Sequence, residues 1–195
     1  MKNVLLALSM VITSLCISCN SNNQSQDSVD SAKQENESLD SSKITSDNKD
    51  SLKDDENFMV NAASGGLLEV KLGNIAMKNA ASAQVKQFGK MMVTDHTKAN
   101  NELIALAKRK NIAIPSTPGN DEQDMIDKLQ KQQGKDFDKD YVSMMIDDHK
   151  HDISEFQKAV DNAKDSDIKA FAVKTLPVLQ KHLDKIQAID STMKK

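Results

Sequence analysis

Three histidines and one glutamate interrupt the apolar stripes of a chain that otherwise has the pattern of amphipathic helices. His96, His149 and His182 each continue a series of apolar residues spaced three or four positions apart, and Glu69 does so in a fourth segment. Imidazole nitrogens and carboxylate oxygens bind transition metals, and four such groups can complete the coordination of one ion. These four residues therefore predict a site for a single Fe, Zn, Mn or Cu ion.

A buried network without metal is the alternative interpretation of the same four residues. Ionisable groups in an apolar core are costly unless they are paired, and Glu69 could pair with one protonated histidine. The layer would then only fix packing register or respond to pH. The sequence shows no Ser-His-Asp pattern, phosphate-binding loop or reactive thiol. It therefore favours a protein that is not an enzyme, and no catalytic residue is predicted.

Other polar residues are candidates for supporting this layer. Asp95, Asp148 and Asp184 flank the histidines in sequence and could accept the hydrogen bonds that fix their tautomers. Tyr141 lies two helical turns before a site histidine and could bond to the site, but packing at the bundle end is the commoner role. The fourth histidine, His151, falls on an outer stripe and is predicted to be solvated, at most an accessory ligand.

Long helices must carry these residues, because glycine and proline are scarce and apolar residues recur with helical spacing. The stretch "AIPSTPGN" at residues 113–120 breaks the pattern, and Pro177 should kink the last helix. The pattern predicts an all-α domain at residues 56–195, a four-helix bundle with a long connection between its second and third helices. Its long helices are expected at about 56–79, 83–111, 136–162 and 167–193, with a short helix in the connection at about 122–132.

The turns of the two expected hairpins place the polar residues at one height. In an antiparallel hairpin, two residues at the same level have the turn midway between them. The midpoint of Glu69 and His96 falls beside the turn predicted at residues 81–82, and that of His149 and His182 falls inside "KDSD". The four side chains are therefore expected to share one layer. The same test leaves the course of the connection between the hairpins open.

Three glycines surround Glu69 in the first long helix. Gly65, Gly66 and Gly73 each cost a helix roughly 1 kcal/mol relative to alanine. Small residues at these positions allow close approach of another helix, or they leave space for a bound group. Both interpretations fit the sequence.

The first 19 residues have the features of a bacterial lipoprotein signal peptide. Lys2 precedes a short apolar run that ends in "CISC", where Ser18 and Cys19 match a lipidation site and Cys16 departs from the usual leucine. Acyl chains on Cys19 would hold the protein on a membrane. We therefore expect a lipid-anchored protein of the bacterial cell envelope, on the outer membrane and facing the periplasm.

Residues 20–55 are acidic, rich in Ser, Asn and Asp, and poor in apolar side chains. Such a composition buries too little surface to offset the entropy of ordering, so a disordered tether is predicted. The whole chain has a net charge of −3, with one Tyr and no Trp. The absence of a basic field and of stacking aromatics excludes nucleic acid as a partner.

Four stretches resemble the DUF4142 family of bacterial envelope proteins, some of which are described as outer-membrane proteins. The stretches are "FMVNAASGGLLEVKLGNIAMKNA", "VKQFGKMMVTDHTKANNEL", "FDKDYVSMMIDDHKHDISEF" and "LPVLQKHLDKI". The resemblance spans about residues 58–190 and implies a ferritin-like four-helix bundle with a long crossover. The recurring Glu and three His of the family fall on Glu69, His96, His149 and His182. The resemblance implies no particular reaction.

One departure separates this chain from di-iron proteins of ferritin-like fold. Those proteins use Glu-x-x-His on two helices together with further glutamates. Here Val93 and Leu179 occupy the positions three residues before His96 and His182. The carboxylates that bridge two irons are missing, so ferroxidase or di-iron oxygenase chemistry is not expected.

Overall fold

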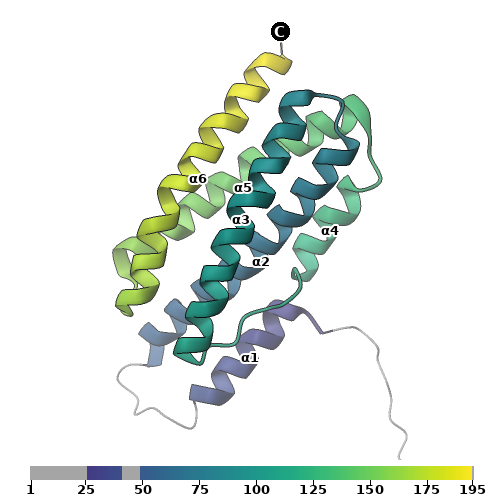
Figure 1. The fold of residues 1–195 in the computed structure, drawn as a ribbon. Coiled ribbons are helices and arrows are strands. Elements are labelled where there is room, and N and C mark those ends of the chain that lie inside the picture. Colours follow the sequence, from purple (N-terminus) through teal and green to yellow (C-terminus); the bar gives the residue numbers. More distant parts are fainter. Residues whose placement is uncertain (1–25, 41–48, 195) are drawn as a thin grey trace, which may run out of the picture.

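The computed structural model describes residues 26–40 and 49–194, and these residues form six helices (Figure 1). The prediction of an all-α fold is confirmed. The helices are α1 (Ser28–Asp40), α2 (Lys49–Asn79), α3 (Ala83–Lys110), α4 (Asn120–Leu129), α5 (Gly134–Asn162) and α6 (Ser166–Met193). The predicted signal peptide and its Cys19 lie outside the described residues. Within those residues, no helix combines the length and the hydropathy that a bilayer crossing requires.

The bundle consists of two antiparallel hairpins, α2–α3 and α5–α6, joined by a connection that carries α4. At one end of the bundle Gly134, where α5 starts, bridges to Ala80 at the end of α2. At the other end Lys110, the last residue of α3, forms a 2.6 Å ion pair with Asp165 before α6. The connection therefore runs the length of the bundle, and α3 and α5 point in the same direction (Figure 1). The predicted long connection with its short helix is present, while the ferritin-like label stays a prediction.

The helix ends follow from local hydrogen bonding. Ser82 caps α3, because its side chain accepts hydrogen bonds from the backbone of Gln84 and Val85. Asn111 ends α3 with φ 56, in the left-handed region that asparagine tolerates. Asp165 caps α6 in the same way as Ser82 caps α3, and α6 continues through Pro177 to its end. The sequence therefore determined these boundaries to within a few residues.

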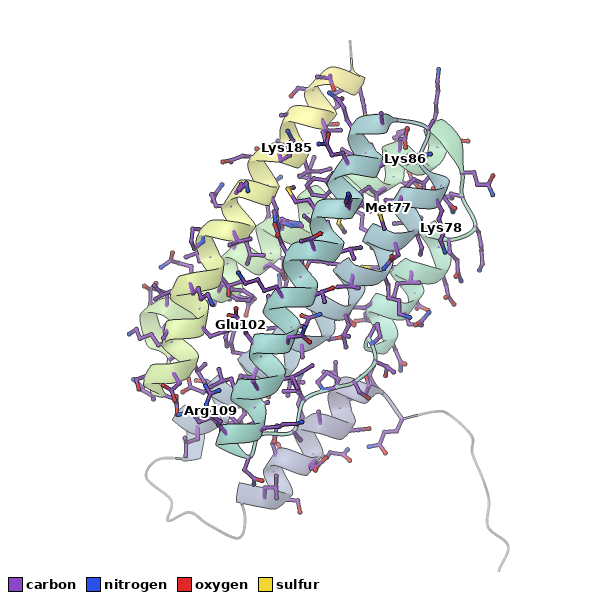
Figure 2. The ribbon with its side chains drawn as sticks, in the orientation of Figure 1. Met77, Lys78, Lys86, Glu102, Arg109 and Lys185 are labelled. Atoms are coloured by element: carbon purple, nitrogen blue, oxygen red, sulfur yellow. The ribbon has the colours of Figure 1, made fainter. Side chains whose placement is uncertain are left out.

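The polar layer divides the apolar core into two clusters. One cluster contains Phe88, Met92 and Met145, and the other contains Leu103 and Phe156. Each histidine of the layer lies between the two clusters along its own helix. Lysine side chains lie on the outside, and Figure 2 labels exposed ones on α2, α3 and α6. The layer is thus enclosed by hydrophobic packing on both sides.

Two of the three glycines in α2 are explained by close packing. A Cβ atom on Gly73 would lie 2.6 Å from the carbonyl oxygen of Gly89, so α2 and α3 touch backbone to backbone there. A Cβ atom on Gly66 would lie 2.1 Å from the side-chain oxygen of Asn100. Gly65 differs, because its nearest neighbour would be the carboxylate of Asp152 at 3.9 Å, an ordinary contact distance.

The prediction of a disordered tether over residues 20–55 is wrong for two parts of that range. Residues 28–40 form α1, and α2 begins at Lys49 rather than near Glu56. Asp27 starts α1 by accepting hydrogen bonds from the backbone of Val29 and Asp30. Composition alone missed this capping signal.

Partners far away in sequence fix α1 to the bundle. Asn36 is buried and exchanges two hydrogen bonds with Ala113, accepting from its N–H at 2.7 Å and donating to its carbonyl at 3.0 Å. Ser28 donates to the carbonyls of Thr117 and Pro118. The backbone of the connection between α3 and α4 thus obtains hydrogen-bond partners that an apolar core would not supply. The same hydrogen bonds hold α1 against the bundle.

Candidate metal centre

All four residues of the predicted layer meet in the centre of the bundle. Glu69 comes from α2, His96 from α3, His149 from α5 and His182 from α6, and each is at most 5% exposed. One ring nitrogen from each of the three histidines lies within 4.8 Å of the other two. The structure therefore contains a His and Glu cluster with the composition of a metal site.

Each imidazole turns one nitrogen outward to an oxygen of the protein. His96 Nδ1 lies 2.6 Å from Glu69 Oε2, and His182 Nε2 lies 2.9 Å from Asp95 Oδ2. His149 Nδ1 lies 2.9 Å from the carbonyl oxygen of Met145. Carboxylate or carbonyl acceptors of this kind orient metal-binding histidines and fix their tautomers.

The other nitrogens face one another. His96 Nε2 and His182 Nδ1 are 3.4 Å apart. Two nitrogens bound tetrahedrally to one zinc ion at about 2.0–2.1 Å are separated by about 3.3–3.4 Å. The observed separation therefore fits two ligands of one ion without rearrangement of either ring.

Two atoms at the centre of the cluster have no hydrogen-bond partner among the described residues. Glu69 Oε1 and His149 Nε2 are both buried, and they lie 3.3 Å apart without forming a hydrogen bond. A buried polar atom without a partner costs about 1–3 kcal/mol. A bound cation would satisfy both atoms at once, with the carboxylate oxygen available as a fourth ligand.

Burial favours the uncharged forms of the cluster. Desolvation lowers the pKa of His96 and of His182 to about 4 and that of His149 to about 3. Desolvation also raises the pKa of Glu69 well above its usual range. Neutral imidazoles present lone pairs to a metal at physiological pH, and a bound cation would favour the ionised carboxylate of Glu69.

The accessory predictions have mixed outcomes. Asp95 lies beside the cluster as an acceptor for His182, and Asp148 Oδ2 lies 4.0 Å from His149 Nδ1. Asp184 does not belong to the cluster, because its side chain is exposed and accepts a hydrogen bond from Gln180 on its own helix. Asp184 follows His182 by two residues, a spacing that places the two side chains on different faces of a helix, so the prediction overlooked the helical repeat.

Tyr141 is a packing residue in this structure. Its ring stacks on Phe137 at 5.4 Å and meets Phe88 edge-on at 6.2 Å. Its hydroxyl is buried without a hydrogen-bond partner among the described residues, and burial raises its pKa well above the usual value. The predicted bond to the site is absent, whereas the packing alternative holds.

Two groups beside the cluster were not predicted from the sequence. The Met145 carbonyl orients His149, and no side-chain pattern announces a backbone acceptor. Asp152 lies one turn after Asp148, and burial, followed by the charge of Glu69, raises its pKa to about 7. The sequence did contain a signal for this carboxylate, because Asp148 and Asp152 lie one helical turn apart, opposite Gly65. His151 is exposed, as its outer position predicted.

Comparison with known proteins places the chain by family and by fold. A family model described as "Domain of unknown function (DUF4142)" matches residues 40–189. A crystal structure of a DUF305 protein from Streptomyces coelicolor, which is described as secreted, aligns with a TM-score of 0.58 at 12% sequence identity. The alignment covers 69% of this chain and 91% of that one. No curated protein matches the sequence. At this identity, the structural likeness supports the helical fold alone.

Proposed function

The chain belongs to the DUF4142 family, and from this premise we propose that it is a cell-envelope protein that binds one transition metal ion inside its helical bundle. His96, His149 and His182 are the ligands through their inward nitrogens. Glu69 orients His96 through Oε2 and offers Oε1 as a further ligand. Zn, Cu, Fe and Ni are the ions that an imidazole-rich site of this kind suits, and Mn becomes more favourable with the carboxylate.

The division of each imidazole into an outward and an inward nitrogen carries this proposal. A purely structural network needs no common orientation of its three rings. Here every outward nitrogen has an oxygen partner at 2.6–2.9 Å, while the inward nitrogens gather with one buried carboxylate oxygen. This arrangement gives each outward nitrogen an acceptor and leaves Glu69 Oε1 and His149 Nε2 without hydrogen-bond partners among the described residues.

Enclosure favours metal handling over catalysis. The three histidines are between 0% and 5% exposed, and hydrophobic clusters pack above and below them. A substrate would have to separate helices to reach the ion, whereas a small cation would not. We therefore assign the site to metal buffering, sensing or protection under stress.

The proposed location follows from the amino terminus. Cys19 is the lipidation site in this proposal, and its acyl chains anchor the protein to the outer membrane on the periplasmic side. The described secretion of the structurally similar DUF305 protein supports a location outside the cytoplasm. The cation would then be taken from the periplasm.

Elemental analysis of the full-length protein, purified without a tag, tests the function. We expect close to one transition metal ion per chain in the wild type and none in His149→Ala. His151→Ala is the matched control, because it removes an exposed histidine from the same helix. Saturating metal should raise the free energy of unfolding by about 4 kcal/mol at a thousand times Kd, in the wild type and the control only.

The opposite result would decide for the alternative interpretation. If the wild type contains no metal after incubation with Fe, Zn, Mn, Ni and Cu salts, the cluster is a hydrogen-bonded network that specifies packing. The 2.6 Å contact of His96 with Glu69 would then be the main interaction of that network.

A further inference from the structure

An acidic groove lies between α1, α2, α4 and α5, on the face of the bundle away from the α3–α6 pair. It encloses about 1160 Å³. Nine carboxylate side chains line it against three lysines, so its interior field is negative. A cleft of one charge sign concentrates ions of the opposite sign and accelerates their arrival. The groove therefore attracts cations.

The groove ends at residues next to the metal centre, and the four cluster residues themselves do not line it. Gly65, Leu68, Asp148 and Asp152 line it, and Leu68 is the immediate neighbour of Glu69 on α2. The Asp148 side chain is only 15% exposed, and its Oδ2 is buried without a hydrogen-bond partner among the described residues. Asp148, Glu69 and His149 each offer a ligand atom within 4.8 Å of the other two.

Unpartnered polar atoms occur both beside the groove and in the cluster. Among the described residues, Asp148 Oδ2, Glu69 Oε1 and His149 Nε2 are all buried without a hydrogen bond, and the three residues offer ligand atoms within 4.8 Å of one another. Acidic residues alone would indicate only a solvated surface. Unsatisfied buried atoms that lead inward from such a surface indicate sites that a cation can occupy in passing.

We propose that this groove is the path by which a divalent cation reaches the histidine cluster, with Asp152 capturing the ion and Asp148 passing it to Glu69. The inference rests on the proposed metal-binding function and adds the route of loading. Gly65 belongs to the same path, because a Cβ atom there would meet nothing closer than Asp152 at 3.9 Å. The glycine leaves the space above the aspartate open.

The opposite face of the bundle is a poorer path. Asp95 is one-third exposed there, but its carboxylate holds the outward nitrogen of His182. An ion arriving at Asp95 would meet the edge of the imidazole that points away from the cluster. The His182 ring itself separates that position from the inward nitrogens.

The rate of metal loading tests the proposal. Metal-free full-length protein is mixed with Co²⁺ in a stopped-flow instrument, and the visible absorption of the bound ion reports association. We expect Asp152→Asn to lower the association rate constant about tenfold while the final amount of bound cobalt stays the same. Asp147→Asn, which makes the same change of side chain at an exposed position on α5, should load at the wild-type rate. The difference should shrink in 0.5 M NaCl, because salt screens the field.

A second variant tests the path by shape rather than charge. Gly65→Leu should slow loading by filling the space beside Asp152, with the final stoichiometry again unchanged. Circular dichroism would first establish that this variant keeps the helical content of the wild type.

The outcomes separate the route from the site. If the wild type binds cobalt and both variants load within twofold of the Asp147→Asn control, the proposed path is wrong and the metal site stands. If the wild type binds no cobalt, the metal-binding function fails and the path fails with it.

Discussion

At the scale of single residues, the orientation of each imidazole decides what the cluster can do. His149 illustrates this, because its Nδ1 is held by the Met145 carbonyl and its Nε2 is buried without a partner. Burial, together with the positive charges that His96 and His182 would carry, lowers its pKa to about 3. The ring is therefore a neutral ligand in the folded chain and a basic group in the unfolded chain.

This difference predicts a specific pH dependence of stability for metal-free protein. The pKa of His149 is lower in the folded chain than in the unfolded chain, where it is about 6.5. The resulting contribution to the free energy of unfolding is therefore complete above pH 6.5 and is lost progressively as pH falls toward 3. Relative to His149→Gln, which cannot titrate, the wild type should lose about 2 kcal/mol between pH 7.5 and pH 5. Urea unfolding of both proteins with a chelator present measures the difference.

The comparison with His149→Gln cancels the buried carboxyls. Glu69, Asp148 and Asp152 have raised pKa values, so their contributions change with pH in the opposite direction, but both proteins contain them. Parallel pH profiles for the two proteins would contradict the assignment of His149 as a buried neutral group.

At the scale of helices, the closest contact fixes how α2 and α3 face each other. Gly73 and Gly89 touch through their backbones, since a Cβ atom on either would lie within 2.7 Å of the carbonyl oxygen of the other. Glu69 lies one turn before Gly73, and His96 lies two turns after Gly89. The contact therefore sets the spacing at which Glu69 Oε2 meets His96 Nδ1.

Gly73→Ala should destabilise the protein although alanine is the better helix former. The added methyl group collides with backbone that cannot rotate away, and overpacking of this kind costs about 1–3 kcal/mol. Gly65→Ala is the control, because its Cβ atom has room and the substitution should add up to about 1 kcal/mol. Thermal unfolding of both variants measures this, and equal melting temperatures would refute the close contact.

At the scale of the whole molecule, buried aspartates tie the two hairpins together at both ends. Asp138 of α5 accepts hydrogen bonds from the backbone of the α2–α3 turn at Ala81 and Ser82. Asp55 of α2 accepts them from the α5–α6 turn at Lys164 and Asp165. The two aspartates are separated along the chain by the same interval as the two helix caps, Ser82 and Asp165. A buried aspartate of each hairpin therefore holds the turn of the other.

The docking of α1 is testable by hydrogen exchange. Asn36→Ala removes both hydrogen bonds to Ala113, each worth about 1 kcal/mol, so the backbone amides of residues 31–40 should exchange faster while α5 stays protected. Gln34→Ala, an exposed change in the same helix, should leave exchange unaltered. Unchanged protection in Asn36→Ala would show that α1 is held by other contacts.

The sequence by itself determined the helical class, the ends of α3 and α6, and the height of the polar layer. These depend on local properties: apolar spacing, capping side chains such as Ser82, and turns midway between paired residues. It also identified Glu69 and the three histidines, because a polar residue on an apolar stripe is visible without neighbours. The prediction of a disordered tether was wrong over α1, because the hydrogen-bond partner of Asn36 lies far away in sequence, in the connection between α3 and α4.

Only the tertiary structure decided which atoms of these residues meet. The rotation of each helix about its axis selects the inward nitrogen of each histidine, brings Asp95 to His182 and leaves Asp184 in solvent. The same rotations place Asp148 and Asp152 between the acidic groove and Glu69. A helical repeat gives the direction of a side chain relative to its own helix, whereas its partners depend on how neighbouring helices pack.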